Sequence, residues 1–258
     1  MQAPQTGTVL ALVAHPDDAE FLCGGTLALL AERGWEIHVA TSTPGDLGSA
    51  DLAPEEIAAV RRAEGAAAAA VIKGDYHCLE LRDLRVVYGE DGLRRFTSLL
   101  RKVRPDLVLT HSPTCYMIDH EETSRMTRAA CFASPVPHTF VVDKDQARPL
   151  DRIPALYYVD AVEGIDLFGS PVPFSFAVDT SSVFDTKLEM LVCHASQREW
   201  LRRQHGMDEY LETARKWSQQ RGTQVGTVHA EVFRQHLGHG YPHENLLAEA
   251  LDGLVITP

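Results

Sequence analysis

The first half of the chain alternates between short apolar runs and longer stretches in which apolar residues recur at helical spacing. The apolar runs have the length of buried strands and end at glycine, proline or polar residues. The predicted strands are residues 9–14, 36–43, 76–81 and 107–110. The predicted helices are residues 25–33, 54–70, 93–104 and 121–132. Strands separated by helices predict a mostly parallel sheet with right-handed crossovers.

The pattern in the second half is less regular. Residues 135–154 are rich in proline and charge and are predicted to be loop. The shorter elements that follow are strands at residues 155–162 and 175–178 and helices at residues 187–193, 197–221 and 244–251. We therefore predict an α/β fold, a Rossmann-like three-layer sandwich. It forms a single domain over residues 1–258, with irregular loops and C-terminal helices in residues 135–258.

The net charge of the chain argues against some classes of binding partner. The 258 residues include 36 acidic and 24 basic side chains, which give a formal net charge of −12. This excess of negative charge argues against nucleic acid or an anionic membrane as the main partner. A strongly anionic substrate would need a local basic pocket. We expect a small molecule as the partner, and the sequence leaves a homo-oligomer open.

Cysteine spacing and hydropathy indicate the compartment. The five cysteines are odd in number and form no C-x-x-C pair, which favours reduced thiols over a disulfide framework. Residues 1–7 lack a signal-peptide pattern, and no apolar run approaches the ~20 residues of a membrane span. We therefore predict a cytoplasmic protein.

Two polar motifs follow predicted strands. The sequence AHPDD, residues 14–18, comes directly after the first strand, and residues 111–120 follow the fourth. Because the carboxyl ends of parallel strands near the switch point face one crevice, we expect the two motifs to lie together. His15, Asp18 and His120 would then converge. Two imidazoles and one carboxylate suit a catalytic Zn²⁺ that keeps one position open for water.

Asp17 lies between two of these predicted ligands and is free for another task. It could take a proton from the zinc-bound water as general base, which predicts metal-assisted hydrolysis. The simpler interpretation of the first motif is a helix N-cap, in which Asp17 or Asp18 caps the next helix without a metal. For His111 alone, the simpler interpretation is a hydrogen-bonded structural residue.

With these motifs the chain resembles the LmbE/PIG-L-type zinc-dependent N-deacetylases. The resemblance rests on residues 14–18 and on Asp119-His120, which are specific together, and on weaker pieces spread over most of the chain. The weaker pieces are residues 43–48, 61–64, 81–83, 104–111 and 230–233.

The resemblance implies that a zinc-activated water hydrolyses an N-acetyl group from an amino sugar or sugar conjugate. His15, Asp18 and His120 would hold the Zn²⁺, and Asp17 would be the base that activates the water. An N-acetylated small molecule is the partner that it implies.

The same resemblance implies roles for further residues. Arg61 and Asp83 fall where the family contacts sugar hydroxyls, which makes them substrate-binding candidates. The alternative for Arg61 is an exposed helix charge paired with Glu64 or Glu56. Asp119 is expected to orient a neighbouring imidazole from behind rather than to bind the metal.

The sequence departs from the family at Met117, where many members carry a histidine that polarises the carbonyl or donates a proton. A thioether can do neither, so this role must fall to another residue. The candidates are Tyr116, His194, His239 and His243. We favour His239 as a catalytic residue because its flanking glycines let the backbone approach a ligand, and we place Tyr116 among the substrate-binding residues. The alternative for His239 is an exposed loop histidine.

Two other functions stay open. The same scaffold could act as a zinc-dependent hydratase, a lyase that adds water to a small unsaturated keto acid. Met117 favours this alternative because the machinery for amide hydrolysis is incomplete. A non-catalytic sugar-binding protein is the third interpretation. Asp17 argues against it, because binding alone needs no spare carboxylate beside a metal.

Overall fold

One sheet organises the protein. The computed structural model describes residues 6–139, 148–199 and 209–257. Within these ranges, eight strands form a single sheet in the order β3-β2-β1-β4-β5-β7-β6-β8. The strands are β1 (Thr8–Val13), β2 (Glu36–Thr41), β3 (Asp75–Cys78), β4 (Leu107–Thr110), β5 (Ala155–Val159), β6 (Phe176–Asp179), β7 (Ala230–Gln235) and β8 (Val255–Ile256). Neighbours from β3 to β5 are parallel, and β7, β6 and β8 extend the sheet antiparallel. The predicted α/β fold with a mostly parallel sheet is confirmed.

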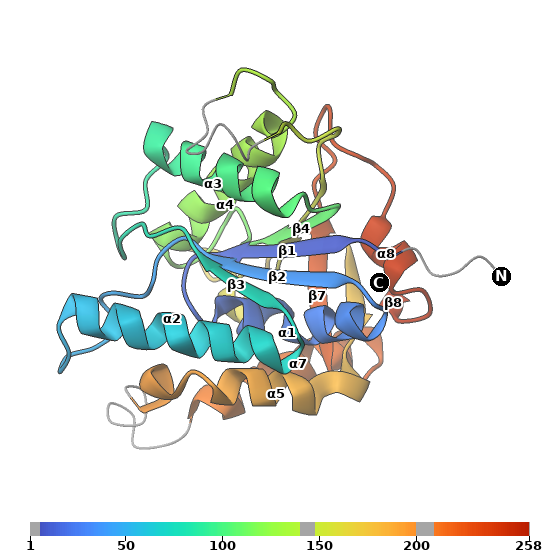
Figure 1. The fold of residues 1–258 in the computed structure, drawn as a ribbon. Coiled ribbons are helices and arrows are strands. Elements are labelled where there is room, and N and C mark those ends of the chain that lie inside the picture. The colour runs from blue at the N-terminus through green and yellow to red at the C-terminus, as the bar shows by residue number, and fades with distance from the viewer. Residues whose placement is uncertain (1–5, 140–147, 200–208, 258) are drawn as a thin grey trace.

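Helices cover both faces of this sheet (Figure 1). The helices are α1 (Asp18–Glu32), α2 (Pro54–Val71), α3 (Glu90–Val103), α4 (Ile118–Ala133), α5 (Phe184–Val192), α7 (Glu209–Val225) and α8 (Leu246–Ala250), with short 3₁₀ turns at Val162–Gly164 and Ser181–Val183. Helices α3 and α4 lie on one face, and α1, α2, α5 and α7 lie on the other. The predicted three layers are therefore present.

The central strand β1 is apolar from Val9 to Val13 because this part is buried on both faces. Successive strand residues point to opposite sides of a sheet. Val9, Ala11 and Val13 join the core beneath α1. Leu10 and Leu12 join the core beneath α3 and α4. This arrangement explains why the strand has no apolar–polar alternation in the sequence.

The start of α1 differs from the prediction. The helix begins at Asp18, seven residues before the predicted start at Gly25. A Cβ placed on Gly25 would lie 2.8 Å from the side chain of Thr180, so this glycine permits close packing within the helix rather than marking its beginning. As a result, the polar motif 14–18 lies directly on the helix N-terminus.

The second half departs further from the prediction. Strands β7 and β8 were not expected, and β7 carries a buried carboxylate, Glu231, in its interior. The predicted loop 135–154 and the predicted helix 197–221 both extend outside the described residues. The described parts of that helix are residues 197–199, which are helical, and α7, which continues to Val225.

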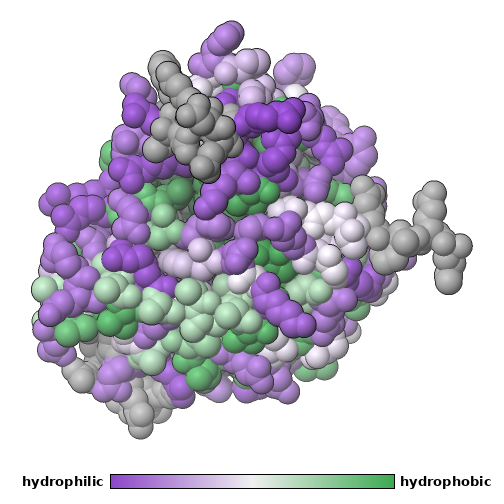
Figure 2. All heavy atoms as spheres, viewed as in Figure 1, coloured by the Kyte–Doolittle hydropathy of each residue, from purple (hydrophilic) through white to green (hydrophobic). Residues whose placement is uncertain are grey.

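The surface in the view of Figure 2 is mostly hydrophilic. A band of hydrophobic residues runs along α2, where Ala66, Ala67 and Ala70 are exposed while Ala68 and Ala69 pack against the sheet. None of the helices in the described part of the chain has both the length and the apolar composition that a membrane span requires.

Candidate metal centre

The sheet brings the two polar motifs together. Strands β1 and β4 are parallel neighbours in a register that pairs Leu12 with Thr110, so both end at the same edge. The chain leaves β1 into the N-terminus of α1 and leaves β4 through a loop into the N-terminus of α4. The motifs at residues 14–18 and 111–120 therefore meet at the carboxyl end of the parallel strands, as expected from the sequence.

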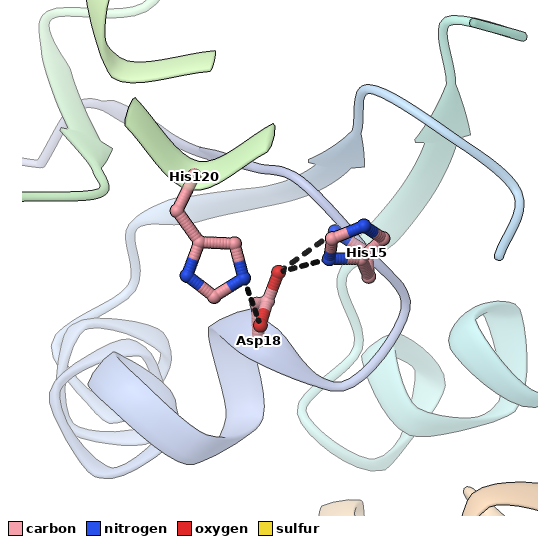
Figure 3. A group of neighbouring side chains, drawn as sticks. All are labelled: His15, Asp18 and His120. Carbon is pink, nitrogen blue, oxygen red and sulfur yellow. Dashed lines mark hydrogen bonds and ion pairs between the residues drawn. The ribbon is translucent and has the colours of Figure 1, made fainter. Parts of the chain in front are cut away.

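His15, Asp18 and His120 converge at this edge (Figure 3). Their nearest ligand atoms all lie within 4.8 Å of one another. Oδ2 of Asp18 is 3.3 Å from Nδ1 of His15, and Oδ1 of Asp18 is 3.4 Å from Nε2 of His120. Oδ2 also accepts a 2.7 Å hydrogen bond from the backbone N–H of His15, which fixes the carboxylate between the two rings.

Each imidazole of this group has a partner on its other nitrogen. Nε2 of His15 lies 3.3 Å from Oδ2 of Asp119, which also accepts a 2.7 Å hydrogen bond from the backbone N–H of Leu84. Nδ1 of His120 lies 3.2 Å from Sγ of Cys115. Asp119 is where the sequence places an orienting carboxylate. The role of Cys115 was missed, because a single buried cysteine five residues before a histidine gives no signal of its own.

The electrostatics of the group favour a cation. Burial alone would lower the pKa of His15, but the carboxylates of Asp119, Asp18 and Asp83 raise it to about 10. Burial, with His111 next, lowers the pKa of His120 to about 3, so this ring is neutral. Without a metal, these carboxylates stabilise a positive charge on His15, which is then protonated. A bound divalent ion would supply positive charge beside the same carboxylates in place of this proton, so the donor set fits a metal such as Zn²⁺.

His111 lies behind the group and is fully buried. Its ring stacks on that of His120, with centroids 3.9 Å apart, and its Nε2 lies 2.9 Å from the backbone nitrogen of Ala14 and 3.2 Å from Oδ2 of Asp18. Its contacts are those of a residue that supports the ligands.

Asp17 is held in an uncommon backbone conformation at the start of α1. Its φ is 106°, in the left-handed region that non-glycine residues rarely adopt and that persists only where the surroundings enforce it. Oδ2 accepts a 3.0 Å hydrogen bond from the hydroxyl of Tyr210, and Oδ1 lies 3.5 Å from Nη2 of Arg61. Burial raises the pKa of Asp17, and Arg61 and Tyr210 oppose the rise. Such a carboxylate is suited to accepting a proton.

Arg61 is part of this site, and its interpretation as an exposed helix charge is wrong. The residue is 5% exposed, and Nη2 donates a 2.7 Å hydrogen bond to the carbonyl oxygen of Pro16. The loop after β2 packs on it: a Cβ at Gly45 or at Gly48 would lie 2.5 Å from Nη1. Glycines in this loop therefore make room for the guanidinium.

Asp83 is buried beside His15. Its Oδ2 accepts a 3.0 Å hydrogen bond from the backbone N–H of Leu47. Its Oδ1 has no hydrogen-bond partner and lies 4.0 Å from Nε2 of His15. An unpartnered carboxylate oxygen next to a cavity is available to a ligand.

A cavity of about 490 Å³ opens over these residues. Most of the predicted site residues line it, including Tyr116, whose ring lies edge-on to His120 at 5.5 Å between centroids. Met117 lines it too, at the position where a histidine would complete the motif. Lining residues from the second half of the chain were not expected; they are Val162, Glu163, Gln197, Tyr210, Thr213 and Trp217.

The structure does not bring His239 to this site. Strand β7 is antiparallel to β5 and ends where β5 begins, so the loop after β7 lies at the opposite edge of the sheet. His239 and His243 are both exposed in that region, and neither lines the cavity. The assignment of His239 as a catalytic residue is therefore wrong for this conformation. His194 is fully buried, with Nε2 3.4 Å from Oε2 of Glu20, and does not line the cavity either.

A family comparison agrees with this geometry. Residues 10–131 match the model of the PIG-L family, whose description is GlcNAc-PI de-N-acetylase. The chain carries a PIG-L (LmbE-like) domain. The matched segment contains both polar motifs and Arg61, whereas Tyr210 lies beyond it.

The relatives that match this chain include a hydratase and deacetylases. A 4-oxalmesaconate hydratase of Pseudomonas putida is 25% identical over 95% of this chain and 94% of its own. A diacetylchitobiose deacetylase of Thermococcus kodakarensis is 25% identical over 73% of this chain and 69% of its own. Among solved structures, an N,N'-diacetylchitobiose deacetylase of Pyrococcus horikoshii superimposes with a TM-score of 0.75 at 24% identity, covering 93% of this chain and 88% of its own. The fold is therefore shared, while the relatives include both deacetylases and a hydratase.

Proposed function

We propose that the protein is a metal-dependent N-deacetylase that acts on an N-acetylated amino sugar or sugar conjugate. The charge of the cavity carries this proposal. Among the described residues that line it, four are carboxylates (Asp17, Asp18, Asp83 and Glu163), against one arginine, Arg61, and the two histidines of the metal-binding group, His15 and His120. A neutral amide substrate enters such a cavity without repulsion, and its product amine becomes a cation that the carboxylates favour.

The metal in this proposal is Zn²⁺, held by His15, Asp18 and His120. Three protein ligands leave a position open, as catalytic zinc sites require. When bound, zinc lowers the pKa of a coordinated water towards about 7 and polarises a carbonyl. Asp119 and Cys115 contact the outer nitrogens of the two histidines, where second partners fix ring orientation.

Asp17 acts as the general base in this reaction. Its carboxylate removes a proton from the attacking water and returns it to the nitrogen of the leaving amine, so that acetate and a free amine are released. Arg61 and Tyr210 hold the carboxylate in place through the contacts described above. Asp83 and Tyr116 contact the hydroxyls of the sugar in this proposal, which is supported by the unpartnered Oδ1 of Asp83 and by the position of both side chains in the cavity lining.

A hydratase that acts on a small unsaturated keto acid is the second candidate. Met117 favours it, because no histidine occupies that place beside the ligands. The hydratase of Pseudomonas putida also covers nearly the whole chain. The charge of the cavity outside the metal group argues the other way. A substrate with several carboxylates would face Asp17, Asp83 and Glu163 there, with Arg61 as the basic side chain among the described lining residues.

The two candidates are separated by their products. Zinc-loaded protein is incubated with N-acetylglucosamine and diacetylchitobiose while acetate is measured, and with unsaturated dicarboxylic keto acids while loss of absorbance is followed. We expect acetate release, and we expect Asp17→Asn to abolish it while zinc content is unchanged. Hydration of a keto acid without acetate release would replace the proposal by the second candidate. Full activity of Asp17→Asn would remove Asp17 from its role.

A further inference from the structure

A second group of metal-ligating side chains lies at the edge of the sheet, outside the catalytic cavity. His38 is on β2 and His77 is on β3, the edge strand, in a register that pairs Ala40 with His77. His38 and Ala40 are two residues apart and point to the same face, where Ala40 joins the core beneath α3 and α4. The two imidazoles lie side by side there, with ring centroids 5.3 Å apart and planes inclined by 28°.

The facing nitrogens of the two rings have the spacing of neighbouring metal ligands. Nδ1 of His38 lies 3.0 Å from Nε2 of His77. Two metal–nitrogen bonds of about 2.0–2.1 Å place their nitrogens about 2.9 Å apart at a right angle and about 3.4 Å apart at the tetrahedral angle. The observed distance lies within this interval. The same distance accommodates one hydrogen bond when no ion is bound.

Glu36 sets the orientation of His38. Its Oε1 lies 3.1 Å from Nε2 of His38, so this nitrogen carries the hydrogen and Nδ1 presents its lone pair to His77. A carboxylate behind the outer nitrogen is the usual partner of a metal-binding histidine. On the inner side, Oδ2 of Asp75 lies 4.0 Å from Nδ1 of His38. The side chain of Asp75 is 76% exposed, so it is free to turn towards an ion.

We propose that His38 and His77 form a second binding site for a divalent transition-metal ion of the Ni²⁺, Cu²⁺ and Zn²⁺ class, with Asp75 as third ligand. Imidazole nitrogens are good ligands for these ions. Binding replaces the hydrogen between the rings, and His77 stays neutral by carrying its proton on Nδ1. Because β3 is the edge strand, the ion would join it to β2. The site is independent of the proposed deacetylase function.

To test this proposal, the catalytic site is first loaded with Zn²⁺. Zinc-loaded protein is titrated with Ni²⁺ by calorimetry, and nickel and zinc are both measured after dialysis. We expect one equivalent of nickel per chain in addition to the catalytic zinc, together with a rise in melting temperature. His77→Gln and His38→Gln should each abolish the nickel uptake and the rise, while zinc content and enzymatic activity stay at wild-type values. His138→Gln, at an exposed histidine elsewhere, should retain nickel binding.

Two results would overturn the site. One is the absence of nickel binding by wild-type protein whose zinc content is unchanged. The other is equal nickel uptake by wild type and His77→Gln. Because His77 is half-buried at the sheet edge, its substitution leaves the core intact, and circular dichroism checks the fold of each variant.

Discussion

The hydroxyl of Tyr210 donates a 3.0 Å hydrogen bond to Oδ2 of Asp17, across 193 positions of the sequence. Asp17 directly precedes α1. Tyr210 lies in the first turn of α7, where it is buried against Phe21 and lines the cavity. The proposed base is thus held by a helix that the PIG-L match does not include. The C-terminal part of the chain contributes to the site through this contact.

Removal of this hydroxyl should weaken catalysis without releasing the metal. In Tyr210→Phe we expect kcat to fall about 10- to 100-fold, the equivalent of about 1.5–3 kcal/mol for a hydrogen bond to a charged group. The pKa of Asp17 should rise because its carboxylate form loses a donor, so the acid limb of the pH–rate profile should move to higher pH. Zinc content, activity and the pH profile are the measurements.

Tyr158→Phe is the matched control for this change. It also removes a buried hydroxyl, one that lies 3.0 Å from Nδ1 of His236, away from the cavity. Its activity should be that of wild type. Equal pH profiles for Tyr210→Phe and Tyr158→Phe would show that Tyr210 does not act through Asp17.

Metal binding should release one proton, and it should come from His15. The pKa of His15 is raised to about 10, so this ring is protonated at pH 6.5 and must lose its proton to bind an ion. The pKa of His120 is lowered to about 3, so this ring is already neutral. Apparent zinc affinity should therefore rise about tenfold per pH unit from about pH 5 to pH 6.5, below the range in which a zinc-bound water also loses a proton. Calorimetry at pH 6.5 in two buffers of different ionisation enthalpy counts the protons; zero or two would contradict the assignment.

The glycine loop after β2 should tolerate no side chain next to Arg61. In Gly45→Ala, a Cβ would lie 2.5 Å from Nη1 of a guanidinium that is buried and hydrogen-bonded, and the residue has a φ of 76°. Gly169→Ala shares the backbone strain, with a φ of 78°, but has no atom within 4 Å of the added Cβ. Gly169→Ala should lose about 1–2 kcal/mol of unfolding free energy, and Gly45→Ala should lose more because of the contact with Arg61. Only Gly45→Ala should also lose kcat/KM, and equal activity of the two would argue against a role for Arg61.

A buried ion pair joins α5 to β7 and should be costly to break. Nζ of Lys187 lies 2.7 Å from Oε1 of Glu231, with side chains 2% and 3% exposed. Lys187→Met leaves the carboxylate buried without its cation, which should destabilise the protein by about 3–5 kcal/mol. Lys216→Met removes an exposed partner of Glu212 and should change stability by less than about 1 kcal/mol. Urea denaturation measures both, and similar values for the two variants would contradict the expectation.

The sequence was sufficient for the parallel part of the fold and for the convergence of the ligands. Residues 9–14 and 107–110 are short, mostly apolar runs of the kind found in strands that are buried on both faces of a sheet. Parallel strands bring their carboxyl ends to the same edge of the sheet. That is why His15 and His120 could be placed together although 105 positions separate them.

The antiparallel part could not be derived in the same way. The segment at residues 230–235 places Glu231 between apolar neighbours, and its charge hid the strand because the partner cation, Lys187, comes from a distant helix. The direction of β7 is set by tertiary pairing, which no local pattern encodes. The misplacement of His239 follows from this, because its flanking glycines, on which the prediction rested, do not show at which edge of the sheet the loop lies. Tyr210 was missed for a related reason: a tyrosine near the start of a helix has the same pattern whether it faces the core or a carboxylate.

The strand order has a consequence for where the chain can be divided. The match to the PIG-L model ends at residue 131. Strand β4 pairs with β1 on one side and with β5 (Ala155–Val159) on the other, so one of its two neighbours lies beyond the match. A fragment cut at the end of the match would leave Leu107–Thr110, which is buried at every position in the full chain, as an uncovered edge strand and a template for self-association. The smallest unit that can be produced as an independent polypeptide therefore extends well beyond the segment that carries the metal ligands.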